Sequence, residues 1–252
     1  MPVEKAGKDL YDWIDQELTD IEPQLAEVGE FNNSANFGRA DKGAAYMLHA
    51  RLALNSEVYT KGAVKDYQKA IDYCNLLDGK YELSKAEKNG YTGYEQVFMA
   101  DNDQNVQAMK EIILPIRQDG AKTKCYSGAN YLVSSTRITG MPYIGTSNGW
   151  SCNFSRAALV KKFFSTIEDC PLATEAAPKD ATEADIIALD KAAGTTTKDV
   201  QAKANDDRAL FYSGCGGGLR KLQADQIAGF NSGLSIVKWS NIRTDGAATS
   251  PQ

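Results

Sequence analysis

Apolar residues recur at helical spacing in the first part of the chain. Over residues 8–25 they fall three or four positions apart with acidic residues between them, which predicts an amphipathic helix. Asp41 stands before an alanine- and leucine-rich run, so we expect a helix over residues 43–59 with Asp41 as its N-cap. A third helix is expected over residues 63–77.

The third segment has Ala63, Tyr67 and Ala70 at the spacing by which the second helix of a tetratricopeptide repeat packs its small and aromatic side chains. Any core helix with alanines has the same spacing. Because paired helices of this length are joined by short turns, we favour tetratricopeptide-like helical hairpins over residues 1-88.

Glycine, tyrosine and asparagine become frequent after Gly79, and helical periodicity becomes rare. Residues 89-252 are therefore expected to form a second, irregular and loop-rich region. Within it, short apolar runs predict strands at 111–117 and 235–239, and a helix is expected over 156–167. Residues 171-205 are rich in Ala, Thr, Asp and Lys and are expected to form a surface insertion with one solvated helix. The expected fold class is mainly α.

The composition is that of an ordinary globular protein, with 252 residues, 42% hydrophobic and 24% charged. A formal net charge of -5 argues against nucleic acid as a partner, because phosphate neutralisation needs clustered Lys and Arg. The acidity favours a neutral partner or a cation. No run approaches the roughly 18 to 20 apolar residues of a membrane helix, and the N-terminus lacks the apolar core of a secretory signal.

The sequence gives little indication of a catalytic site. His49 is the single histidine and sits within a predicted helix, so a triad with a Ser or Cys nucleophile is hard to build. We expect it to be a packed or surface histidine. Asp and Glu are abundant enough to supply the two carboxylates of a glycoside hydrolase, since these need only meet in space. That alternative stays open.

Oxygen-bearing side chains occupy alternate positions in the segment that contains Asp101, Asp103 and Asn105, as they do in loops that wrap calcium. The segment departs from the EF-hand pattern, because Val106 replaces the glycine and Ile112 stands where the bidentate Glu belongs. An Asx-rich turn between two elements has the same composition.

Aromatic residues gather in a region rich in Gly, Ser and Asn: Tyr126, Tyr131, Tyr143, Trp150 and Phe154. Sugar rings present apolar C–H faces that stack on Tyr and Trp, while neighbouring polar side chains donate to hydroxyls. This composition suits a glycan-binding surface. Packing of the same rings in a core is the alternative.

Several runs coincide with one family, among them Phe98-Met99-Ala100-Asp101-Asn102-Asp103 and Thr146-Ser147-Asn148-Gly149-Trp150-Ser151-Cys152. The other matching runs are 39–42, 50–55, 111–120, 140–142, 206–210 and 234–239. The chain resembles the SusD/RagB family, and within it the starch-binding SusD proteins of Bacteroidetes. The likeness spans nearly all 252 residues, with 171-205 the most divergent part.

The resemblance implies a tetratricopeptide-like scaffold that carries an irregular ligand-binding region. Relative to the family pattern the chain looks like an internal fragment, roughly the middle half. The resemblance also implies a full-length protein that is lipid-anchored at the extracellular face of the outer membrane, with the anchor outside this fragment. Its implied partner is a SusC-like TonB-dependent transporter.

In starch-binding members an arc of aromatic rings follows the curve of the α-glucan, and two of those rings align with Tyr126 and Trp150. The resemblance also implies a structural calcium ion, for which Asp103 and Asn105 are the best matches and Asp101 a weaker one, with other ligands outside this chain. The leading hypothesis is therefore non-catalytic binding of starch and malto-oligosaccharides for delivery to the transporter. A glycoside hydrolase and a purely structural repeat protein are the alternatives.

Overall fold

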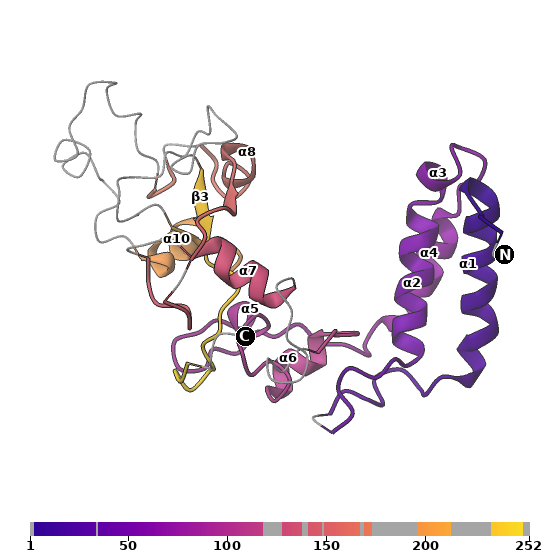
Figure 1. Cartoon of the computed structure of the whole chain (residues 1–252), viewed down its shortest axis with the longest axis horizontal. Coiled ribbons are helices and arrows are strands. Elements are labelled where there is room, and N and C mark those ends of the chain that lie inside the picture. Colours follow the sequence, from indigo (N-terminus) through magenta and orange to yellow (C-terminus); the bar gives the residue numbers. More distant parts are fainter. Residues whose placement is uncertain are drawn as a thin grey trace. The chain divides into compact units, whose positions relative to one another are not determined.

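The computed structural model is mainly helical within the residues it describes and has short strands there, which confirms the predicted fold class (Figure 1). The described residues are 3–33, 35–117, 128–137, 141–147, 149–166, 169–172, 196–212 and 233–248. The chain forms two compact units, one of Met1–Ser84 with Asp103–Arg117 and one of Lys85–Asn102 with Gln118–Gln252. The divisions predicted at residue 88 and at 171-205 stay predictions, and residues 173–195 lie outside the described part.

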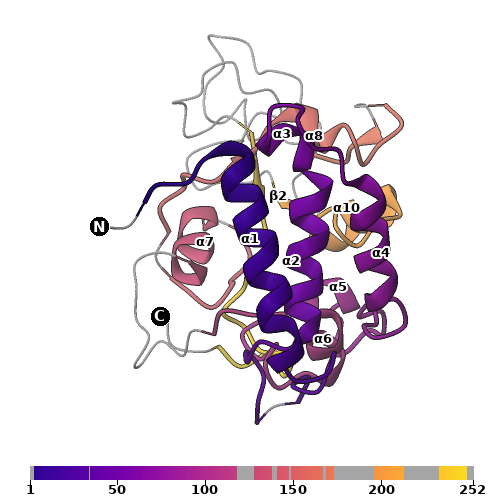
Figure 2. The same cartoon turned by 90° about the vertical axis from the view of Figure 1, so that its right-hand side faces the viewer.

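Three helices lie side by side in the first unit, with α2 (Lys42–Leu54) between α1 (Gly7–Ile21) and α4 (Tyr67–Leu77) (Figure 2). The predicted N-cap is confirmed, because the Asp41 carboxylate accepts from the backbone N–H of Gly43 at 2.8 Å and of Ala44 at 3.3 Å. Such a cap satisfies donors that the first turn leaves unpaired.

The first and second predicted helices end earlier than expected. After α1 the chain forms a short 3-10 turn, η1 (Glu22–Gln24), whose proline cannot donate to an α-helical ladder. The run expected over 43–59 is broken at Asn55 into α2 and a single turn, α3 (Ser56–Tyr59). Asn55 ends α2 with its side-chain amide donating to the Arg51 carbonyl at 2.8 Å.

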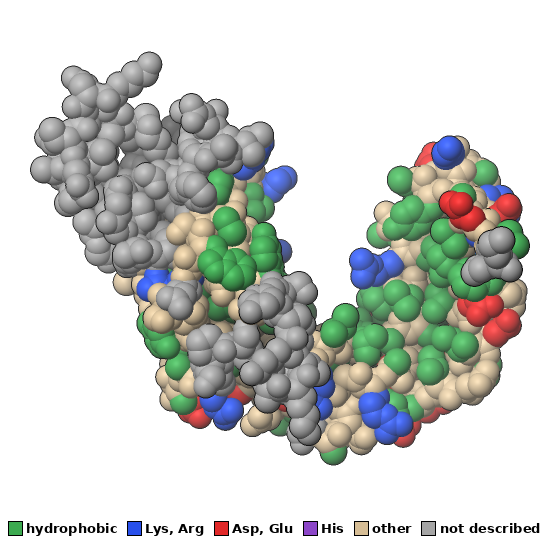
Figure 3. Space-filling view, viewed as in Figure 1, with side chains coloured by type: hydrophobic (Ala, Val, Ile, Leu, Met, Phe, Trp, Pro, Cys, Tyr) green, Lys and Arg blue, Asp and Glu red, His purple; other side chains and the backbone are tan. Residues whose placement is uncertain are grey.

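Part of the repeat-like packing predicted for the third helix is wrong. Ala63 is exposed and precedes α4, and Tyr67 is exposed with its hydroxyl donating to the Glu57 carboxylate at 2.6 Å. Ala70 is buried as predicted. Large apolar side chains remain exposed on the helices of this unit (Figure 3): Trp13, Leu48, Leu54, Ile71 and Leu76.

The strand predicted at 111–117 is also wrong. Glu111 ends a helix, α6 (Val106–Glu111), which Asn105 caps by accepting from Gln107 N at 3.1 Å. Residues 112–117 are irregular, and the Arg117 guanidinium donates to the Phe37 carbonyl at 3.3 Å.

The second unit contains a small antiparallel sheet in the order β1-β3-β2, made of β1 (Phe154–Ser155), β3 (Leu234–Ile236) and β2 (Phe211–Tyr212). The strand expected at 235–239 is thus present but shorter and shifted. The described part of the second unit also contains the helices α5 (Gly93–Gln96), α7 (Ala129–Thr136), α8 (Ala157–Val160) and α10 (Thr197–Ala204).

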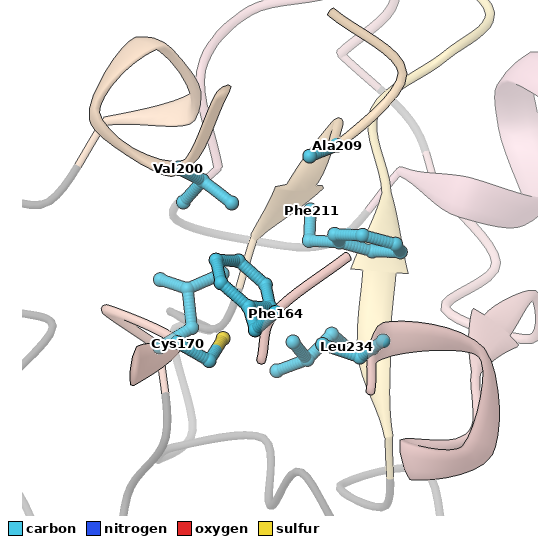
Figure 4. Packing of buried hydrophobic residues seen from close by; sticks show 8 residues of the cluster. Phe164, Cys170, Val200, Ala209, Phe211 and Leu234 are labelled. Atoms are coloured by element: carbon cyan, nitrogen blue, oxygen red, sulfur yellow. The ribbon is translucent and has the colours of Figure 1, made fainter. Parts of the chain in front are cut away.

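A hydrophobic core joins these helices and strands (Figure 4). Val200 of α10, Phe211 of β2 and Leu234 of β3 meet in it, and Phe164 packs there as well. The helix expected over 156–167 is only one turn long, because the chain turns after Val160 and carries Phe163 and Phe164 to this core. Within the described residues, no helix combines the length and apolar content needed to cross a bilayer.

Candidate functional site

The loop that carries Trp150 is fixed to helix α7 by main-chain hydrogen bonds. The Trp150 N–H donates to the Ser134 carbonyl at 2.8 Å, and the N–H groups of Cys152 and Asn153 both donate to the Ser135 carbonyl at 2.9 Å. The N–H of Ser151 donates to the Arg137 carbonyl at 3.3 Å. These main-chain hydrogen bonds fix the backbone of Trp150. Its position therefore does not require the ring to be buried in a core, and the ring can face solvent.

Gly149 allows this close approach. A Cβ at this position would lie 2.1 Å from the Arg137 carbonyl oxygen and 2.6 Å from the carbonyl carbon, distances that real Cβ atoms do not show. The glycine immediately before Trp150 is therefore required by the distance between loop and helix rather than by an unusual φ. Ser151, directly after the tryptophan, has a positive φ of 51° and turns the chain back along α7.

Tyr131 of α7 lies beside Trp150. Their ring centroids are 5.8 Å apart and the ring planes are inclined by 55°. Tyr131 is 46% exposed and Trp150 is 42% exposed, so both rings keep accessible surface. The sequence placed Tyr131 in an irregular region, but it belongs to a helix whose other face is buried through Val133, Ser135 and Thr136.

That buried face gives the aromatic pair a rigid base. Val133 packs with Met141 and Ile144, and the partly buried rings of Tyr212 and Trp239 close the cluster. Tyr143 is 54% exposed and has no ring contact among the described residues. Phe154 lies in β1 and is half-buried. Of the aromatic residues singled out in this region, Tyr131, Tyr143 and Trp150 are thus exposed, whereas Phe154 is partly packed.

Tyr126, the other ring predicted to contact sugar, lies outside the described residues. The described site therefore consists of Trp150 and the residues that hold it. The signal for Tyr131 was present in the sequence, because residues 129–136 have helical periodicity with Val133 inside. Its ring contact with Trp150, which is 19 positions away, could not be predicted, because no local pattern in the sequence indicates such a contact.

Asp101, in the second unit, acts as a structural tie. One carboxylate oxygen accepts from the Thr244 backbone N–H at 2.9 Å and the other from the Thr244 hydroxyl at 2.6 Å, and both residues are buried. The side chain joins positions 143 residues apart in the sequence.

Asp103 and Asn105 belong to the first unit. The Asp103 carboxylate pairs with the Arg117 guanidinium at 3.0 Å, and the Asn105 amide oxygen caps α6. These oxygen ligands are of the type that calcium prefers. Within the described residues, however, no three His, Cys, Asp or Glu side chains converge on one point. The described residues do not form a complete cation site by themselves, and calcium stays a prediction that requires further ligands.

An acidic surface cavity is the place where a hydrolase pair would be sought. It has a volume of about 570 Å³, and Glu87, Asp206 and Asp207 line it together with Lys198. A glycosidase needs one carboxyl group with a raised pKa to act as the acid. Asp206 does not meet this requirement, because hydrogen bonds from Arg208 lower its pKa.

Comparison with known proteins gives one strong likeness. The chain is 51% identical over 255 aligned positions to the starch-binding protein SusD of Bacteroides thetaiotaomicron. The alignment covers 99% of this chain, whereas the chain spans 44% of the length of that curated relative. No protein-family model matches the chain.

Proposed function

The chain belongs to the SusD family, and on that premise we propose that the protein binds starch and malto-oligosaccharides without cleaving them. The observation that carries this proposal is the placement of Trp150, whose ring is 42% exposed on a loop held by main-chain bonds. A core tryptophan would be enclosed. A ring that is presented to solvent by a fixed backbone suits a ligand.

The proposed mechanism is stacking of glucose units on aromatic faces. The C–H face of a sugar ring covers the apolar face of Trp150, and Tyr126 supplies a second such face. By analogy with aromatic pairs, each contact contributes on the order of 1 kcal/mol, so useful affinity needs several contacts and a ligand that is already curved. A loop fixed before binding lowers the entropy lost on association.

Calorimetric titration of the full-length protein with maltoheptaose tests this proposal. We expect Trp150→Ala and Tyr126→Ala each to weaken binding by about fivefold, the loss of one contact of about 1 kcal/mol. Unchanged affinity in both variants would contradict the assignment. Tyr59→Ala is the matched control, since Tyr59 is also an exposed aromatic residue but belongs to α3 in the first unit and is not assigned to the sugar site.

Binding without cleavage is distinguished from hydrolysis by a reducing-end assay on amylopectin. We expect no release of reducing ends, because the relative that this chain resembles is a starch-binding protein. Hydrogen bonds from Arg208 lower the pKa of Asp206, so this carboxyl is not the proton donor that a hydrolase would need in the cavity. If the protein releases reducing ends and Asp206→Asn or Glu87→Gln abolishes this release, the cavity is a hydrolase site and the proposal is wrong.

We also propose that the protein acts at the extracellular face of the outer membrane, held by a lipid anchor, and passes glucan to a SusC-like TonB-dependent transporter. Family membership supports this location and partner. Protease treatment of intact cells should degrade the protein, and affinity purification should recover the transporter. Protection from protease, or purification without any transporter, would contradict it.

A further inference from the structure

The segment that follows β3, residues 238–244, links two parts of the second unit that lie far apart in the sequence, and we call it the strap. On one side it is bonded to the segment after α5. The Ser240 N–H donates to the Phe98 carbonyl at 3.2 Å, and the Ala100 N–H donates to the Ile242 carbonyl at 3.0 Å.

On its other side the strap supports the base of α7. The Asn241 N–H donates to the Ile144 carbonyl at 2.8 Å. Gly145 lies so close to the strap that a Cβ there would come within 2.4 Å of the Asn241 Cβ. Trp239 packs against the cluster in which Ile144 meets Val133 of α7. The strap is therefore in contact with the helix to which the loop of the candidate site is bonded.

The strap ends at a buried anchor, Thr244. Its hydroxyl donates to one carboxylate oxygen of Asp101 at 2.6 Å and its backbone N–H to the other at 2.9 Å, and Thr244 is only 1% exposed. The Thr244 carbonyl accepts from the side-chain amide of Asn89 at 2.7 Å. Hydrogen bonds to a carboxylate are stronger than those between neutral groups, and a buried oxygen that loses its donor is costly. These bonds fix the end of the strap.

We propose that Thr244 is a positioning residue for glucan binding: its bond to Asp101 holds the strap against α7 and thereby keeps Trp150 in the position that binds sugar. The inference rests on the proposed function, because it assumes that Trp150 contacts the ligand. Thr244 itself touches no sugar. When its hydroxyl is removed, the strap and α7 gain freedom that binding must take away again, so affinity falls.

Titration calorimetry of the full-length protein with maltoheptaose tests this role. Thr244→Val keeps the shape and the backbone N–H but removes the hydroxyl donor. We expect it to weaken binding by about threefold, which is less than the loss of the Trp150 contact itself. Thr244→Ser keeps the hydroxyl donor and should bind as the wild type does.

Val200→Ala is the stability control. Val200 is fully buried in the hydrophobic core of α10, β2 and β3, so this change destabilises the same unit outside the contacts of the strap. Both Val200→Ala and Thr244→Val should lower the melting temperature, but only Thr244→Val should weaken maltoheptaose binding. If these two variants bind alike, or if Thr244→Ser binds as weakly as Thr244→Val, the inference is overturned.

A double-mutant cycle shows whether Thr244 acts through Trp150. In the Trp150→Ala background we expect Thr244→Val to have no further effect on affinity. An equal loss in both backgrounds overturns the role assigned to Thr244.

If Thr244→Val does not fold, Asn89→Gly replaces it. This change removes the donor to the Thr244 carbonyl, and glycine tolerates the positive φ of 52° at that position. We expect it to weaken maltoheptaose binding in the same direction, and an unchanged affinity in this variant overturns the inference.

The outcomes also distinguish this inference from the proposed function. If the wild type does not bind maltoheptaose, the proposed function fails and the inference fails with it. If the wild type binds and Trp150→Ala weakens binding, but Thr244→Val binds like Val200→Ala, only the positioning role of Thr244 is refuted.

Discussion

Gly149 lies against the carbonyl group of Arg137 so closely that a Cβ at position 149 would come within 2.1 Å of the oxygen. Arg137 follows the last residue of α7, and Gly149 precedes Trp150 in the adjacent loop. The position of the Trp150 ring therefore depends on Gly149. Because Gly149 has no side chain, the loop can lie close enough to α7 for its main chain to be held there.

We predict that Gly149→Ala weakens maltoheptaose binding although it removes no sugar contact. The added methyl group forces the loop away from α7 and breaks the bond from Trp150 N to Ser134 O, so the fixed ring position is lost. Overpacking of this kind destabilises by about 1 to 3 kcal/mol. Calorimetric affinity and thermal denaturation measure the two effects. Ser147→Ala, an exposed change in the same loop, should alter neither.

The local parts of the fold were predictable from the sequence. Helix α1 follows from apolar spacing, and the start of α2 follows from Asp41, since capping depends on neighbours two and three positions away. The run at 111–117 was mistaken for a strand because its apolar residues resemble one, while the cap at Asn105 that creates α6 lies outside the run. Composition could not decide whether Trp150 is exposed. That depends on bonds to α7, which a linear pattern does not contain.

Buried hydrogen bonds between distant segments are a second kind of feature that could not be predicted from the sequence. Asp101 stays a weaker calcium candidate, and in the structure its two carboxylate oxygens accept from the Thr244 backbone N–H and hydroxyl. We predict that Asp101→Ala destabilises the protein by about 1 to 3 kcal/mol, because it leaves the buried Thr244 donors unpaired. Asp101→Asn retains one acceptor and should cost less. Urea denaturation measures both, with the exposed Asp207→Ala as control.

Calcium binding at Asp103 is predicted for the full-length protein, where the further ligands would be supplied. Calcium at about 100 times its Kd stabilises by about 2.7 kcal/mol, so EDTA should lower the melting temperature. Asp103→Ala should abolish this shift. Arg117→Gln removes the ion pair to Asp103 but leaves the carboxylate, so its melting temperature should still respond to EDTA. A wild type that melts at one temperature in calcium and in EDTA would contradict the prediction.

His49 makes the stability of the first unit depend on pH. The ring is buried, its Nδ1 lies 2.9 Å from the Asp15 carboxylate, and it stacks on Tyr73 with centroids 4.2 Å apart. Burial lowers the pKa of His49 below its ordinary value of 6.5, and the hydrogen bond and charge of Asp15 oppose this only in part. The folded protein therefore prefers the neutral ring.

The sign of the pH effect follows from this lowered pKa. Above pH 6.5 the histidine is neutral in both states, so its pKa shift has no effect on stability. As the pH falls below 6.5, the unfolded chain binds a proton that the folded chain resists, and stability falls by at most about 1.4 kcal/mol per pH unit until the folded pKa is reached. His49 is the single histidine of the chain, so this window reports on it.

We predict that the melting temperature falls between pH 7.5 and pH 5.5, and that His49→Phe flattens this dependence by removing the titrating ring. Asp15→Asn should steepen it, because the carboxylate that favours the charged ring is gone. Asp12→Asn, on the same helix and exposed, should leave the slope unchanged because that carboxylate pairs with Lys8 instead. If wild type and His49→Phe lose stability equally over this range, the pH dependence comes from other groups.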